Sequence, residues 1–68
     1  MEYGTVKWFS DRRGFGFISR SGGVPDIFVH HSGIAGQRGR RALTDGAAVE
    51  FEISENERGI MAVNVSQV

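Results

Sequence analysis

The sequence has no cysteine, a single proline and a single tryptophan among its 68 residues. Without cysteine there is no disulfide framework, no thiolate zinc site and no cysteine nucleophile. No apolar run approaches the roughly 20 residues that a membrane-spanning helix needs. Because acidic Glu2 follows Met1 with no apolar stretch after it, we expect no secretory signal, no membrane association and a cytoplasmic location.

The chain also lacks net charge, since eight Lys and Arg residues balance eight Asp and Glu residues. This balance argues against a protein that holds nucleic acid by bulk positive charge alone. Residues 1–41 nevertheless hold seven basic and three acidic side chains, whereas residues 42–68 hold one basic and five acidic side chains. The zero is a cancellation between two halves, and we expect a polarised surface.

So short a chain predicts a single domain over residues 1–68. Such a domain buries only about 60% of the surface that its unfolded chain exposes, which favours a binding surface over a deep catalytic cleft. Asp11, Asp26 and Asp45 lie in predicted turns, where carboxylates normally cap backbone amides. No nucleophile–base pair can be argued from the spacing, so we expect neither an enzyme nor a bound cofactor.

The residues that are abundant favour an all-β domain. Twelve residues are Val or Ile, which suit pleated strands, and ten are Gly, about twice the usual share of about 7%. Turn signals divide the chain into five expected strands at 3–9, 14–19, 26–31, 48–54 and 60–65. Five short strands predict a small barrel, which removes sheet edges by closing. The longest connection follows the third strand, and Ser32 is a candidate cap for one helical turn there.

The last two expected strands each have one apolar face under period-two alternation. These faces, expected to point inward, are Val49, Phe51 and Ile53 on one strand and Met61, Val63 and Val65 on the other. The second and third strands differ, because each has an aliphatic face and an aromatic face. The aromatic faces carry Phe15 and Phe17 on the second strand and Phe28 and His30 on the third.

Two arrangements of these strands are open. Either the phenylalanines fill the barrel, or Ile18, Ile27 and Val29 fill it and the rings point outward. Two observations favour outward rings: histidine is a poor choice for a small dry core, and basic residues flank the aromatic segments. The flanking residues are Lys7, Arg12, Arg13 and Arg20. Contiguous exposed aromatics mark an interaction site.

Aromatic rings among basic residues suit single-stranded nucleic acid. Unpaired bases stack on Phe, Trp and His, and Lys and Arg meet the phosphates. Residues 13–18, Arg-Gly-Phe-Gly-Phe-Ile, fit the start of the RNP1 pattern with Ile in place of Val. Their glycines either let a base approach the backbone closely or provide a bend that lets a short strand coil.

At these motifs the chain resembles a cold-shock protein of the bacterial type, a free single cold-shock domain. The segments that carry the resemblance follow the family's order and spacing: Gly4–Phe9, Arg13–Ile18, Asp26–His30, Ser32–Ile34, Asp45–Gly46, Val49–Phe51 and Ala62–Val65. The resemblance implies a five-stranded antiparallel OB-fold barrel that binds single-stranded RNA and DNA with little sequence preference. It also implies RNA-chaperone activity with effects on transcription and translation, and we expect no obligate protein partner.

Carried onto this sequence, the resemblance implies stacking or edge contacts from Trp8, Phe15, Phe17, Phe28 and His30. It adds Phe9 as a partly exposed contact and Lys7 as a contact to the nucleic-acid backbone. The expected binding residues also include Arg13, His31 and Arg40. Strict alternation would put Val6 and Trp8 on one face, although Val6 suits the core and Trp8 the surface, and a twist or bulge near Lys7 would resolve this.

Two departures from the family pattern concern the site. His31 stands where the motif often continues with Phe; imidazole can still stack. We expect no metal at this histidine pair, because strand neighbours point to opposite faces and no other Cys or His completes a site. The loop after the third strand has Arg38, Arg40 and Arg41 where an aromatic often stacks a base. We predict that Arg40 or a neighbour partly replaces that ring, the alternative being a solvated charge run.

Two other functions remain open from the sequence. Selective recognition of a duplex promoter element lacks the signal of a recognition helix or β-ribbon. A protein-interaction module would use the same aromatic patch to hold a peptide or a partner surface. Trp8, the only tryptophan, is expected on the patch, so its fluorescence can discriminate between these ligands.

Overall fold

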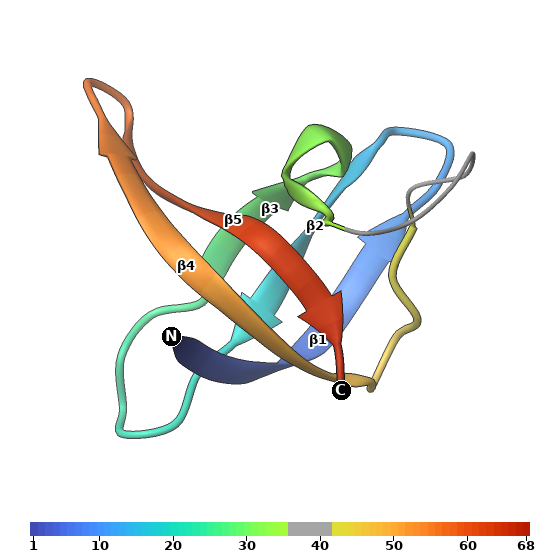
Figure 1. The fold of residues 1–68 in the computed structure, drawn as a ribbon, viewed down its shortest axis with the longest axis horizontal. Helices are drawn as coiled ribbons and strands as arrows, with labels where there is room; N and C mark the ends of the chain where they lie inside the picture. The colour runs from blue at the N-terminus through green and yellow to red at the C-terminus, as the bar shows by residue number, and fades with distance from the viewer. Residues whose placement is uncertain (36–41) are drawn as a thin grey trace.

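The computed structural model describes residues 1–35 and 42–68, which form five strands and one short helical turn (Figure 1). The strands are β1 (Glu2–Ser10), β2 (Phe15–Ser19), β3 (Ile27–His30), β4 (Ala48–Asn56) and β5 (Gly59–Gln67). The turn is a 3-10 helix, η1 (His31–Gly33), directly after β3. The prediction of an all-β fold with five strands is confirmed. Among the described residues no helix has the length and apolar character to cross a membrane.

The strands close into a barrel in the order β1-β2-β3-β5-β4. β1 completes the ring, because it pairs with β2 on one side and with β4 on the other. The expected antiparallel arrangement is wrong at one place, since β3 and β5 run parallel. Strand directions cannot alternate all the way round a closed ring of five, so one neighbouring pair has to be parallel. The architecture is consistent with the predicted OB-fold barrel.

Aliphatic side chains and two phenylalanines fill the barrel. The buried apolar residues are Val6, Phe9, Ile18, Ile27, Val29, Ile34, Leu43, Val49, Phe51, Ala62 and Val65. Ile18, Ile27 and Val29 are at most 1% exposed. The arrangement in which β2 and β3 turn their aliphatic faces inward, with Phe15, Phe17 and Phe28 outward, is therefore confirmed.

A β-bulge at Lys7 puts Val6 inside the barrel and Trp8 outside. The pairing of β1 with β2 shifts register between these two residues, so Lys7 is the extra residue. The segment before β4 holds the bulge, because the Gly46 amide donates to the Val6 carbonyl at 2.7 Å. The predicted bulge is confirmed. The hydrogen bond that holds it comes from Gly46, about forty residues farther along the chain, and forms only when the chain folds.

The same bulge turns Phe9 inward. The Phe9 amide donates to the Asp45 carboxylate at 2.9 Å, so Asp45 caps a backbone amide as predicted. The Phe9 side chain is only 9% exposed and belongs to the core. The expectation of a partly exposed Phe9 is therefore wrong, because the extra residue at position 7 reverses the alternation that follows it.

A second irregularity, in β5, corrects the expected face of that strand. The pairing of β4 with β5 shifts between Glu50 and Glu52, and Asn64 adopts a positive φ of 53°. This extra residue brings Ala62 as well as Val65 into the core. The expectation that Met61 and Val63 point inward is wrong, since both are half-buried on the outside of the barrel.

The end of the β4–β5 hairpin extends past the barrel (Figure 1). Among the described residues, β3 pairs with β5 only at Met61 and Ala62, so no described strand other than β4 pairs with β5 between Met61 and the hairpin turn. Ile53 was expected in the core with Val49 and Phe51, but it is 41% exposed. It lies where the hairpin leaves the barrel, and the interior no longer covers it.

Candidate nucleic-acid interface

Six ring side chains form one continuous surface on the outside of β1, β2, β3 and the start of η1. We call this surface the aromatic face; it comprises Trp8, Phe15, Phe17, Phe28, His30 and His31. The first five are half-buried and His31 is exposed. The structure thus brings together six of the ten predicted binding residues, which come from three separate places in the chain: position 8, residues 15–17 and residues 28–31.

Strand register builds this surface. Phe17 lies opposite Trp8 on one side and opposite Phe28 on the other, while Phe15 lies opposite His30. Directly opposite residues on one face of antiparallel strands lie close enough for their side chains to touch. Three strands therefore bring rings that are up to 22 residues apart in sequence, Trp8 and His30, into one layer.

Phe28 is the centre of the aromatic face. Its ring centroid lies 5.7 Å from that of Phe15, 5.9 Å from that of Phe17 and 6.5 Å from that of His30. Trp8 closes the other end at 5.7 Å from Phe15 and 5.4 Å from Phe17. Stacked, tilted and edge contacts of this kind are attractive. The rings hold one another in place, and their outward parts remain for a ligand.

His30 has its orientation fixed by the turn that follows it. The Ser32 amide donates to His30 Nδ1 at 3.3 Å, and the Ser32 hydroxyl lies 2.9 Å from the same nitrogen. His30 therefore caps η1, and the expectation that Ser32 is the cap is wrong, although the predicted helical turn is present. Because Nδ1 accepts, the proton of the neutral ring lies on Nε2, which is left to donate to a ligand.

His31 ends the aromatic face beside the β1–β2 turn. Its ring centroid lies 4.3 Å from that of His30, so the expectation that the two histidines point to opposite faces is wrong, because β3 ends at His30 and His31 begins η1. The His31 amide donates to the Gly14 carbonyl at 2.8 Å. Gly14 has a φ of 79°, and a Cβ there would lie 2.8 Å from His31 Cδ2. Glycine at this position therefore makes room for the His31 ring as well as for the turn.

Gly16 serves the packing of strands rather than the approach of a base. It is buried, and a Cβ there would overlap the Trp8 carbonyl oxygen and lie 2.7 Å from Phe9 Cα. Any side chain would push β1 away from β2 and displace Trp8. Neither of the two roles considered for the motif glycines describes this position, because the absent side chain makes room for β1 against β2.

Basic side chains lie at the margins of the aromatic face. Lys7 is exposed, and its Nζ pairs with the Asp26 carboxylate at 2.9 Å. Arg13 is exposed in the β1–β2 turn, where its amide donates to the Ser10 hydroxyl at 3.2 Å. Arg40 lies outside the described residues, so its stacking stays a prediction.

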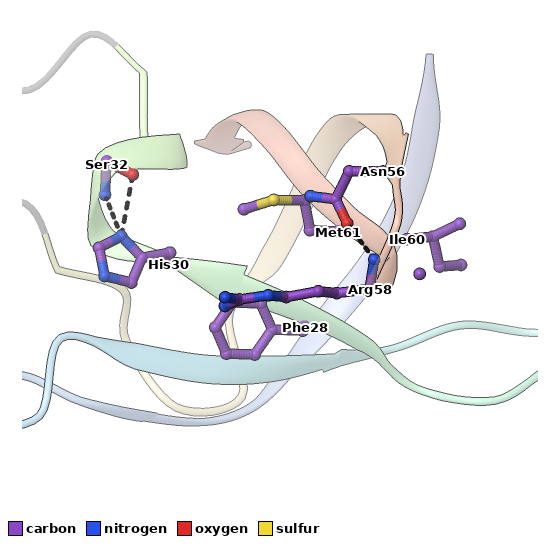
Figure 2. Close-up of a pocket in the computed structure, with 8 residues that line it drawn as sticks. Phe28, His30, Ser32, Asn56, Arg58, Ile60 and Met61 are labelled. Carbon is purple, nitrogen blue, oxygen red and sulfur yellow. Dashed lines mark hydrogen bonds between the residues drawn. The ribbon is translucent and has the colours of Figure 1, made fainter.

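A groove borders the aromatic face on the side of the β4–β5 hairpin (Figure 2). Its volume is about 440 Å³, and its lining comprises Phe28, His30, Ser32, Asn56, Arg58, Gly59, Ile60 and Met61. Figure 2 shows the Arg58 side chain reaching from the hairpin turn toward Phe28. The Arg58 amide donates to Asn56 Oδ1 at 2.9 Å, which fixes the turn.

Arg58 was not among the predicted site residues, because its half of the chain is acidic. The available signal was the Asn-x-x-Gly spacing of residues 56–59, which is typical of a tight turn between two strands. That turn puts the one basic residue of the acidic half beside the rings. The sequence pattern predicts the turn between β4 and β5. It does not predict the strand order that places this turn beside β3.

The chain matches the family model described as "'Cold-shock' DNA-binding domain" over residues 2–68. It is 50% identical over 68 residues to the cold shock-like protein CspLB of Listeria monocytogenes, covering 100% of both chains. It is 48% identical over 68 residues to the cold shock-like protein CspA of Stigmatella aurantiaca, covering 100% of this chain and 98% of that one. It is also 48% identical over 66 residues to the cold shock protein ScoF of Streptomyces coelicolor, covering 97% of each.

Proposed function

The chain belongs to the cold-shock domain family, and from this premise we propose that it binds single-stranded RNA and DNA with little sequence preference. The aromatic face is the observation that supports this most directly. Its rings have π-faces of the kind on which any base can stack, and such stacking does not depend on base identity. A duplex keeps its bases stacked on each other, so it cannot use this surface.

Charge around the aromatic face supports phosphate contacts that are few in number. Arg13 and Arg58 are exposed, whereas the Lys7 ammonium already has a carboxylate partner. With about two to four phosphates neutralised, the logarithm of the binding constant should fall with the logarithm of salt concentration with a slope of roughly −1.4 to −2.8. A slope as steep as that of a heavily basic protein would contradict binding dominated by stacking.

Binding of this kind would make the protein an RNA chaperone. Each unpaired base held on the aromatic face shifts the balance of a weak hairpin toward its open form by mass action. No phosphate-binding loop is present in the sequence, and this mechanism needs neither nucleotide hydrolysis nor catalysis. We propose that opening such hairpins in cytoplasmic transcripts is how the protein affects transcription and translation.

The test uses Trp8, the only tryptophan, as a reporter at the edge of the aromatic face. Its fluorescence is followed while single-stranded oligothymidine is added, with a matched duplex as the control ligand. We expect strong, saturable quenching by the single strand and little response to the duplex. Equal binding of both would favour duplex recognition. No response to either would leave a protein partner as the better explanation of the aromatic face.

A further inference from the structure

A second groove lies on the outside of β1 and β2, away from the hairpin. Its volume is about 420 Å³, and its lining comprises Tyr3, Gly4, Thr5, Ser19, Arg20 and Ser21. Thr5 and Ser19 are directly opposite each other, and the next pair along, Val6 and Ile18, points into the core. The groove therefore opens on the outer face of these strands, the same face that carries Trp8 and Phe17.

Tyr3 gives this groove an aromatic wall. A Cβ on the next residue, Gly4, would point at Ile18 and Phe51 in the core, so Tyr3 points outward by alternation. Its side chain is 65% exposed, and within residues 1–35 and 42–68 its ring contacts no other ring. Tyr3 is thus a free ring surface, whereas each ring of the aromatic face is held by a neighbour.

Arg20 gives the groove a positive charge in a fixed place. Its Nε and Nη2 donate to the Pro25 carbonyl at 3.1 and 2.8 Å, which orients the guanidinium without neutralising it. The ion pair between two described residues joins Lys7 to Asp26, and Arg20 is not part of it. The Arg20 charge therefore has no carboxylate partner among the described residues, and a guanidinium suits phosphate oxygens. On the far side, Glu50 lies opposite Tyr3 on β4 and would repel a phosphate, which favours the Arg20 side.

The groove continues the aromatic face by two rows of residues. Trp8 and Phe17 form the last aromatic row, Thr5 and Ser19 the next outward row, and Tyr3 the one after it on β1. Successive rows on one face of a sheet are about 7 Å apart. A single-stranded nucleic acid that crosses the aromatic face and leaves it past Trp8 meets the hydroxyls of Thr5 and Ser19 and then the Tyr3 ring.

We propose that this groove binds one further nucleotide of the same single strand, with its base on the Tyr3 ring and its phosphate on the Arg20 guanidinium. The assignment rests on the single-strand binding proposed above, and it extends the bound length beyond the aromatic face. The volume of about 420 Å³ and the hydroxyls of Thr5, Ser19 and Ser21 suit a polar ligand of nucleotide size.

The test compares wild type with Tyr3→Ala, using oligothymidines lengthened one nucleotide at a time and Trp8 quenching as the readout. For wild type we expect affinity to rise with length and then level off. For Tyr3→Ala we expect it to level off one nucleotide earlier, with about five- to tenfold weaker binding of the longer strands and unchanged binding of the short ones. Tyr3→Phe is the matched control and should behave as wild type, because it keeps the stacking ring.

Three results would overturn the assignment, and they differ in what else they imply. If the affinity of Tyr3→Ala depended on oligothymidine length as that of wild type does, the proposed nucleotide site at Tyr3 would be wrong, and binding at the aromatic face would be unaffected. Equal weakening of short and long strands would mean that Tyr3 acts through the fold, which thermal unfolding of the variant would reveal. If wild type bound oligothymidine of no length, both the function proposed above and the site at Tyr3 would be wrong.

Discussion

The outer face of β1, β2 and β3 and the outer face of β4 and β5 cover the same core with opposite chemistry. The first carries the aromatic face, with basic residues at its margin. The second carries carboxylates, including Glu50 and Glu52, and Asn64 donates to the Glu52 carboxylate at 2.6 Å. Both faces alternate with buried Val, Ile and Phe side chains. The interior requires only apolar side chains of fitting size, so the two outer faces are free to differ, and the difference carries the function.

Phe51 and Phe28 are the same residue type in two different environments, the core and the outer face. Phe51 is fully buried at 0% exposed, whereas Phe28 lies outside the barrel among the other rings. Phe51→Ala should lose about 3–5 kcal/mol of unfolding free energy. A domain of this size without staples has roughly 3–5 kcal/mol in total, so we expect the variant to be largely unfolded. Circular dichroism with urea titration measures this; a stably folded variant would mean that the two halves do not share one core.

Phe28→Ala should have the second largest effect, and on binding instead of folding. It removes the ring that contacts Phe15, Phe17 and His30, so we expect single-strand binding to weaken by about 1–3 kcal/mol. The urea midpoint should stay close to that of wild type. Phe28→Tyr, which keeps a stacking ring, serves as control. Unfolding of Phe28→Ala would show that the outer rings carry the fold as well.

Arg13→Gln and Glu52→Gln test the charge difference, with the smallest expected effect. If Arg13 contacts a phosphate, its loss should make the salt slope shallower by about 0.7. Glu52→Gln keeps an oxygen that accepts from Asn64 and removes only the charge, which lies on the other outer face. At an ionic strength of about 0.1 M we expect little change in affinity, because charges farther apart than about 10 Å are screened. Equal effects of both variants on the slope would mean that charge acts over the whole protein, and not at one face.

The sequence was sufficient wherever a local pattern ran without interruption. The five strands, the aliphatic interior of β2 and β3, and the outward rings follow from turn residues, from alternation and from the unsuitability of histidine in a small dry core. Most of the candidate site was found in this way, because Phe15, Phe17, Phe28 and His30 alternate with core residues inside short regular strands.

The errors cluster where an extra residue interrupts the alternation. The bulge at Lys7 moved Phe9 into the core, and the one near Asn64 moved Met61 out of it. Arg58 was missed for another reason, since its place beside Phe28 depends on β5 pairing with β3. Local pattern cannot give these positions, because hydrogen bonds and strand pairings between distant segments decide them.

By itself, the sequence determined which side chains suit the core and which suit a ligand, since that choice depends on the polarity and shape of each residue. Only the tertiary structure decided which of them meet. The Asp45 carboxylate and the Gly46 amide hold the bulge that turns Trp8 outward, and the parallel pairing of β3 with β5 brings Arg58 to the rings. Both are contacts between residues far apart in the sequence, and they form when the barrel closes. No stretch of neighbouring residues contains them.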